Sequence, residues 1–242
     1  MNTKHTTTYF KAVRPDGSSF RDQSFRWLPE GWRSGDPIPE GWTVEHPDYS
    51  PTGTARRYLS VSTVATDCIG MRWPLVLLEV EAVGETRSPE PGSMPSKRAG
   101  AAFRVVRELS ATDALGPQGE HVAALIERCQ WLTASDVQRL ASVWAGVSAD
   151  ALNLALNDAG DAAWRTARSA AADVAADAVW AVAGRAVWVA DGSSVWATRY
   201  AAWSAALGLS VRDLISPGIY YTLTRAWRAT IGPIHPDDDL ED

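Results

Sequence analysis

The chain has 242 residues, a formal net charge of −6 and two cysteines. Its length is enough for one large domain or two small ones. Acidic residues are in excess and no block of lysine or arginine occurs, so binding to nucleic acid is not expected. No stretch reaches the ~18 apolar residues of a membrane-spanning helix, and the N-terminus has no apolar signal region. We therefore predict a cytoplasmic protein with no membrane partner.

Cysteine and histidine give no indication of a metal site. Cys68 and Cys129 lie far apart, and no histidine stands near either at the spacing of a metal site, so neither a disulfide framework nor a zinc site is predicted. The motifs HExxH and GxSxG do not occur, and there is no glycine-rich phosphate loop. From motifs alone, no cofactor and no catalytic triad are predicted.

The first part of the chain has the pattern of short strands joined by turns. Five strands are expected, at residues 9–13, 19–27, 57–64, 74–83 and 101–109. Residues 14–18 (RPDGS) favour a hairpin turn, because Asp-Gly supplies the positive φ that such a turn requires. Many prolines and glycines at residues 29–51 predict ordered loops, and residues 84–97 predict a mobile loop. Residues 1–112 are expected to form a β-rich module.

Beyond residues 115–119 (LGPQG) the apolar residues recur at helical spacing. Helices are expected over residues 122–132, 137–147 and 217–231, with at least two more in residues 151–207. The last stretch is rich in alanine, which favours helix before any packing is counted. The predicted fold class is α+β: a mainly β N-terminal module, a helical bundle at residues 118–232, and a solvated acidic tail at residues 233–242.

Tryptophan recurs on the alanine background of the central helices. Five large residues fall at i, i+3, i+4, i+7 and i+11, namely Trp196, Arg199, Tyr200, Trp203 and Leu207. This spacing places them on one stripe of a helix. We predict that the stripe is a buried face of the bundle; an aromatic cage for a ligand is the alternative.

Two blocks of sequence carry a resemblance to a protein family. They are KAVRPDGSSF at residues 11–20 and SVRDLISPGIYYTLTRAWRATIGPIHPDD at residues 210–238, with the alanine- and tryptophan-rich middle between them. The chain resembles uncharacterised accessory proteins of bacteriophages that infect actinobacteria. This resemblance covers most of the chain and implies a phage origin, but it brings no activity with it.

A second resemblance concerns the N-terminal module. Arg14 follows the first expected strand, residues 60–63 (SVST) lie on a middle strand, and Glu79, Glu81 and Glu108 are candidate acids. This order is similar to that of the ADP-ribosyltransferase fold. The resemblance implies NAD as a cofactor, with Arg14, Ser62 and Glu81 as catalytic residues. Alternating serine and glutamate is also typical of the solvated face of a strand.

Three tryptophans in loop-rich sequence are candidate binding residues: Trp32, Trp42 and Trp73. Aromatic residues dominate the energetics of protein interfaces. Indoles among prolines also commonly pin irregular loops onto a sheet, so a structural role is the alternative.

The sequence therefore predicts a non-catalytic phage accessory protein that acts in the host cytoplasm by binding a host or phage protein. The alternatives are an ADP-ribosyltransferase-like enzyme, a nucleotide-binding sponge that uses the N-terminal module, and a structural component of the virion. The alanine-rich helices are compatible with packing inside one chain or across a homo-oligomer, so the oligomeric state stays open.

Overall fold

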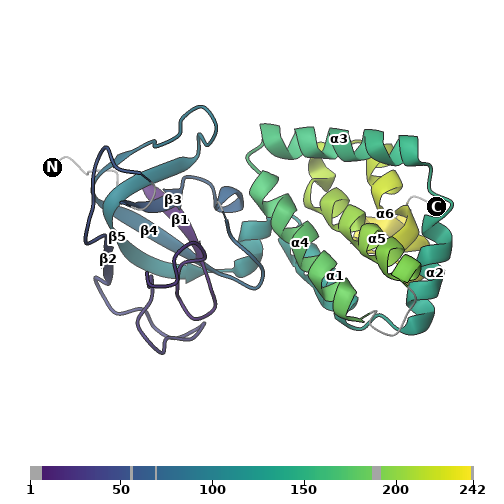
Figure 1. Ribbon diagram of the computed structural model, residues 1–242, viewed down its shortest axis with the longest axis horizontal. Helices are drawn as coiled ribbons and strands as arrows, with labels where there is room; N and C mark the ends of the chain where they lie inside the picture. The colour runs from purple at the N-terminus through teal and green to yellow at the C-terminus, as the bar shows by residue number, and fades with distance from the viewer. Residues whose placement is uncertain (1–6, 55–56, 69, 187–191, 241–242) are drawn as a thin grey trace. The chain divides into compact units, whose positions relative to one another are not determined.

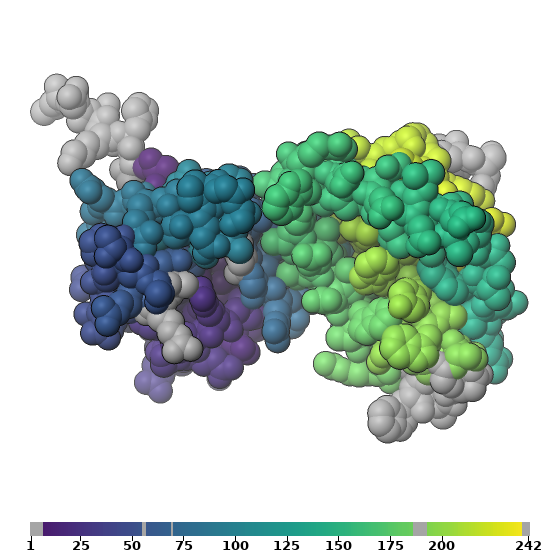
Figure 2. Space-filling model, turned by 45° about the horizontal axis from the view of Figure 1, so that its top comes forward, coloured from purple at the N-terminus to yellow at the C-terminus, as the bar shows by residue number. Residues whose placement is uncertain are grey.

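The computed structural model describes residues 7–54, 57–68, 70–186 and 192–240 (Figure 1). The chain divides into two compact units, Met1–Ala114 and Leu115–Asp242. Among the described residues, the first unit holds five strands and the second six α-helices. The predicted α+β class, with a strand-rich module followed by helices, is confirmed. Figure 2 shows the surface of both units, coloured along the chain.

The strands of the N-terminal unit are all paired antiparallel. They are β1 (Thr8–Val13), β2 (Thr43–Glu45), β3 (Leu59–Ser62), β4 (Val76–Arg87) and β5 (Lys97–Leu109). Their order is β2-β5-β3-β1-β4, and β4 also pairs with β5. Strands β5, β3, β1 and β4 therefore close into a ring, which leaves fewer free edges than an open sheet. The core of this unit includes Val13, Trp27, Leu28, Leu78 and Phe103.

Two predictions for this unit are wrong. The strand expected at residues 19–27 is absent from the described structure, which has there only an isolated bridge between Ser18 and Arg26. Asp16 accepts hydrogen bonds from the backbone N and the Oγ of Ser18, and such local bonds compete with strand pairing. The loop expected at residues 84–97 is also shorter than predicted, because β4 continues to Arg87 and β5 begins at Lys97.

The described part of the second unit has six α-helices: α1 (Gly119–Gln130), α2 (Ala134–Trp144), α3 (Ala149–Arg165), α4 (Ser169–Ala186), α5 (Gly192–Ser210) and α6 (Pro217–Ile231). Thr133 and Asp136 form a capping box at the start of α2, and Ser216 caps α6 with Pro217 in its first turn. Helix α5 contacts each of the other five helices and is the centre of the unit (Figure 1). No helix in the described ranges is long and apolar enough to cross a membrane.

The predicted buried stripe on α5 is wrong. Leu207 is buried, but Trp196 is 53% exposed and Tyr200 is 44% exposed. The buried face of α5 instead consists mainly of small residues, including Thr198, Ala201, Ala202, Ser204, Ala205 and Ala206. Small side chains let neighbouring helix backbones approach closely, and an indole at the same contact would hold them apart. The alanine face therefore takes the interior, and two of the large residues stay at the surface.

The acidic tail was predicted to be solvated; Pro236 and Asp237 are exposed as expected, but the prediction is wrong for Asp238. A short 3₁₀ helix, Pro236–Leu240, follows α6. Asp238 is buried, where it accepts a hydrogen bond from the Tyr220 hydroxyl at 2.9 Å and from the backbone N of Ile234 at 2.8 Å. Burial is the main cause that raises the pKa of Tyr220, and the Asp238 carboxylate raises it further. The tail is thus anchored on α6.

The packing of α5 predicts how alanine positions respond to enlargement. Ala205 is fully buried, so Ala205→Leu forces extra volume into a close helix contact and should lower the free energy of unfolding by about 1–3 kcal/mol. Ala151 on α3 is exposed, and Ala151→Leu should change the free energy of unfolding by less than about 0.5 kcal/mol. Urea unfolding followed by circular dichroism measures both. Equal effects of the two substitutions would contradict the close packing of the alanine face.

Candidate functional site

An aromatic cluster lies on the helical unit. We define it as Trp144 of α2, Trp180 of α4, and Trp196, Tyr200 and Trp203 of α5. Tyr200 is at its centre, with ring centroids 5.1 Å from Trp180, 6.2 Å from Trp144 and 6.4 Å from Trp203. These separations are typical of attractive edge-to-face and stacked contacts. The cluster joins three helices and keeps its two most exposed rings in fixed positions.

A cation is held inside the aromatic cluster. The guanidinium carbon of Arg199 lies 5.4 Å from the ring centroid of Trp180 and 5.8 Å from that of Trp196. Its Nε is buried and has no hydrogen-bond partner within the described part of the chain. A Cβ at Gly184 would overlap this guanidinium, so the glycine leaves the space that Arg199 fills. The guanidinium thus lies close to two indole rings, an arrangement that stabilises a cation.

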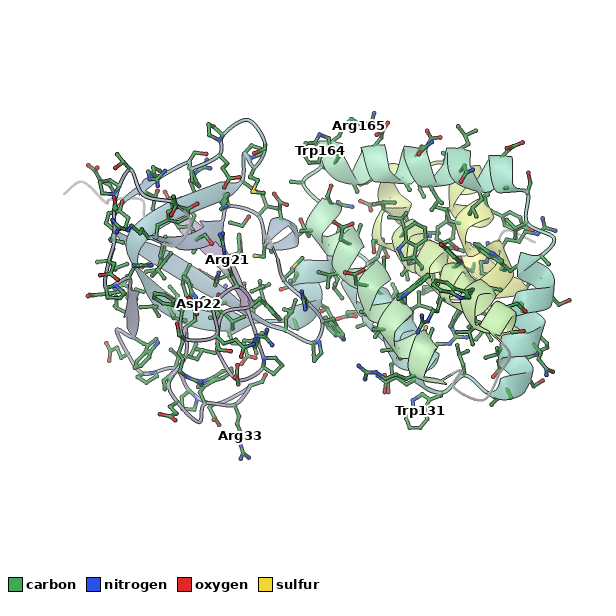
Figure 3. The ribbon with its side chains drawn as sticks, viewed as in Figure 1. Arg21, Asp22, Arg33, Trp131, Trp164 and Arg165 are labelled. Carbon is green, nitrogen blue, oxygen red and sulfur yellow. The ribbon has the colours of Figure 1, made fainter. Side chains whose placement is uncertain are left out.

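The aromatic cluster has the composition of an interface hot spot. Tryptophan, tyrosine and arginine are the residues most enriched where protein partners bind most strongly. Two other exposed tryptophans, Trp131 and Trp164, have no ring contact with another aromatic residue in the described structure (Figure 3). Scattered single apolar side chains are normal on a protein surface, whereas a contiguous group commonly marks an interaction site.

From sequence, three members of this cluster, Trp196, Tyr200 and Trp203, were expected on a buried face, and Trp144 and Trp180 were not singled out as site residues. Helical spacing correctly groups three of its members on one stripe of α5, but it carries no information on which face of a central helix meets its neighbours. The predicted binding residues lie elsewhere, in the N-terminal unit. Trp32 is buried and donates from Nε1 to the Asp36 carbonyl at 3.1 Å.

The other two predicted tryptophans are also partly buried. Trp42 packs against the core of the N-terminal unit and donates from Nε1 to the Trp27 carbonyl at 3.0 Å. Trp73 is half-buried and precedes a cis peptide bond to Pro74. No ring contact joins any two of Trp32, Trp42 and Trp73 among the described residues. Trp32 and Trp42 thus hold loops onto the core.

The N-terminal unit contains a cavity of about 1410 Å³. It lies beside β1 and β3. Residues 19–27, 46–48, 67–68, 70–72 and 90–94, with Lys97 at the start of β5, complete its wall. Strands β1 and β3 pair only at Phe10 and Ser62. Next to this pair, the Nζ of Lys11 donates a hydrogen bond to the Ser60 carbonyl at 3.0 Å. In a longer β-ladder a backbone N–H would donate to this carbonyl; here the lysine side chain replaces it. The cavity opens where the two strands separate.

The three candidate catalytic residues are not gathered around this cavity. Ser62 lines it, and its Oγ accepts from the backbone N of Val64 at 3.1 Å. Arg14 lies over the ring of Phe20 with 5.5 Å from its guanidinium carbon to the ring centroid. Glu81 forms an ion pair with Arg104 across β4 and β5. Neither Arg14 nor Glu81 is among the residues that line the cavity.

Lys11 is a charged residue of the cavity that the sequence analysis did not single out. Its Nζ lies 5.0 Å from the ring centroid of Trp27. Burial lowers the pKa of Lys11 from 10.5 to about 8; Cys68 opposes this shift, and the positive charges of Arg21 and Lys97 add to it. Burial also raises the pKa of the Cys68 thiol to about 12, so this cysteine is protonated at neutral pH and is a poor nucleophile.

Comparison with known proteins identified no relative of this chain. No protein-family model matches the chain, and neither a curated protein nor a solved structure shows significant similarity to it. Within the described ranges, no three histidine, cysteine, aspartate or glutamate side chains are grouped so as to hold a metal ion.

The position of Arg199 predicts different effects of two glycine substitutions. A Cβ at Gly160 of α3 meets nothing within 4 Å, so Gly160→Ala should raise the free energy of unfolding by about 0.5–1 kcal/mol through its higher helix propensity. Gly184→Ala should show little of this gain, because its methyl group displaces Arg199 from the indoles. Urea unfolding and tryptophan fluorescence measure both effects. An equal gain with unchanged emission would contradict the placement of Arg199.

The lowered pKa of Lys11 predicts a pH dependence. Between about pH 8 and pH 10.5 the unfolded chain keeps the Lys11 proton and the folded chain has lost it. The unfolded state then binds more protons, so this group makes folding more favourable as pH rises. The free energy of unfolding of the wild type, minus that of Lys11→Met, should increase from pH 8 to pH 10.5. A difference that stays constant in urea unfolding would show that Lys11 titrates normally.

Proposed function

We propose that this chain is a non-catalytic protein that acts by binding a protein partner through the aromatic cluster of its helical unit. The observation that carries the proposal is that Trp196 and Tyr200 stay exposed on the central helix while its alanine face is buried. Leaving these rings at the surface has a free-energy cost, since each would be favourable to bury. A partner that covers them would recover that energy.

The aromatic cluster is already organised for such binding. Contacts with Trp144 and Trp180 hold the ring of Tyr200, and Arg199 lies against the faces of two indoles. A surface that is fixed before binding loses less conformational entropy when a partner covers it. Few side chains therefore need to be ordered at the moment of association.

The sequence resemblance supports a proposal for the partner and for the cellular location of this binding. Likeness to accessory proteins of actinobacteria-infecting phages favours a host or phage protein as the partner and the host cytoplasm as the place. The ADP-ribosyltransferase alternative has less support from the geometry, because of its three candidate residues Ser62 lines the cavity and Arg14 and Glu81 do not. We therefore place the function in the helical unit.

The proposal is tested with a surface variant and a matched control. In Trp196→Ser/Tyr200→Ser the two exposed rings of the aromatic cluster are removed. Trp131→Ser removes an indole that is 75% exposed in the same unit but outside the cluster. Tagged wild-type protein should enrich a defined protein from a lysate of a phage-infected actinobacterial host. The cluster variant should lose that protein, and Trp131→Ser should retain it.

The interaction is then measured with purified components. Loss of two hot-spot aromatics should raise the dissociation constant by about 1,000-fold, since such residues contribute about 2 kcal/mol or more each. Circular dichroism confirms that each variant is folded. If every protein captured by the wild type is captured equally by the folded cluster variant, the proposed binding surface is wrong.

A further inference from the structure

We propose that the cavity of the N-terminal unit is a second binding site, which takes a small planar anion: an aromatic ring that carries a phosphate or a carboxylate. This site lies in a different unit from the aromatic cluster and involves none of its residues. The inference therefore goes beyond the proposed protein binding and does not depend on it.

Lys11 is the charged group on which the preference for an anion depends. An ammonium group has three N–H donors, and the described structure gives Lys11 one acceptor, the Ser60 carbonyl, besides the ring face of Trp27. No carboxylate forms an ion pair with Lys11 among the described residues. Lys11 is half-buried, and a charge that is partly removed from water without a counterion is unfavourable, so an anion in the cavity would compensate it.

The acidic residues of the wall are engaged elsewhere. Four basic and four acidic side chains line the cavity, so its formal charge is balanced. Glu90 pairs with Lys97 at 2.8 Å, Asp67 accepts from the hydroxyl of Ser96, and Asp22 accepts from Ser24. Three of the four carboxylates therefore already have a hydrogen-bond donor. Lys11 is a cation of this wall that has no ion pair among the described residues.

A second cation reinforces the preference for an anion. Arg21 also lines the cavity, on the loop that follows β1, where Figure 3 labels it beside Asp22. Arg21 and Lys97 both lower the pKa of Lys11, because nearby like charges disfavour its protonated form. Glu90 offsets the charge of Lys97. An anionic group bound at Lys11 would thus also be attracted by Arg21.

The planar part of the ligand is inferred from the aromatic lining. Half-buried aromatic rings reach the cavity from both strand β1 and the following loop, namely those of Phe10, Phe20 and Phe25. Trp27 and Tyr58 add two further aromatic side chains to the wall. Rings of this kind stack on planar ligands, with a gain of about 1–3 kcal/mol per base in nucleic-acid complexes. The combination of stacking rings and an unpaired ammonium fits an aromatic anion.

The test compares complete ligands with their parts by isothermal titration calorimetry. AMP, NAD and pyridoxal phosphate represent aromatic phosphates, and anthranilate represents aromatic carboxylates. Adenosine has a ring without the anion, and inorganic phosphate has the anion without a ring. We expect submillimolar binding for at least one complete class and binding at least about tenfold weaker for both parts. If no aromatic anion of either class binds below the millimolar range, the proposal is wrong.

Two substitutions locate the binding. Lys11→Met removes the unpaired cation and should weaken binding of the aromatic anion at least about tenfold. Arg33→Met removes an exposed cation of the same unit that does not line the cavity and points away from the strands in Figure 3, and should leave binding unchanged. Circular dichroism verifies folding. Equal binding by wild type and folded Lys11→Met would overturn the proposal.

Proton uptake on ligand binding distinguishes direct contact between Lys11 and the anion from a role of Lys11 in maintaining the shape of the cavity. Because the pKa of Lys11 is about 8 and an anion raises it, binding near pH 8.5 should take up a proton, and the affinity should fall as the pH rises further. Titrations in buffers of different ionisation enthalpy detect this uptake. It should disappear in Lys11→Met, whereas Arg33→Met should retain it.

Pyridoxal phosphate also maps the site chemically. Its aldehyde condenses with a neutral amine to an imine with loss of water, and cyanoborohydride with a proton reduces the imine to a stable secondary amine. The chain has three lysines, Lys4, Lys11 and Lys97, so peptide mass spectrometry identifies the labelled one. We expect preferential labelling of Lys11 near pH 8, which AMP suppresses. Labelling of Lys11 no faster than Lys4 would contradict access to the cavity.

Discussion

Close packing of the alanine face of α5 is the constraint on which the helical unit depends. Helix α5 contacts each of the other five helices, and its buried positions are mostly alanine, serine and threonine. Backbones that approach so closely leave no room for an indole between them. Trp196 and Tyr200 are excluded from that contact and gather with Trp144 and Trp180 at the surface. The proposed partner surface is thus a consequence of how the core is packed.

The N-terminal unit follows a different constraint, the satisfaction of backbone hydrogen bonds. Strands β1 and β3 pair at a single position, and Lys11 donates to a carbonyl beside that pair. The same ammonium lies against the ring of Trp27, where its charge has no carboxylate partner in the described residues. The Lys11 side chain therefore has two roles. It bonds a β3 carbonyl where β1 and β3 separate, and it places a positive charge in the wall of the adjacent cavity. This dual role makes Lys11 informative about the ligand.

The two sites use the same residue types in opposite ways. In the aromatic cluster, indoles enclose the Arg199 cation and present their own surface, so the charge supports an apolar contact. In the cavity, aromatic rings surround a cation that is accessible from inside. The aromatic cluster presents an exposed surface that a protein partner can cover. The cavity encloses a space that a small ligand can fill.

The sequence by itself determined the class of the fold and most of its helices. Alanine propensity, the Thr133 and Ser216 caps and the apolar spacing are local signals, and local hydrogen bonding enforces them. Strand 19–27 was predicted wrongly because Asp16 and Asp22 bind their own neighbours instead of a partner strand. Tertiary structure alone decided which face of α5 is buried, and that Lys11 lines a cavity which Arg14 and Glu81 do not. The buried face of α5 and the lining of the cavity depend on which elements pack against one another. Residue spacing within one element does not contain that information.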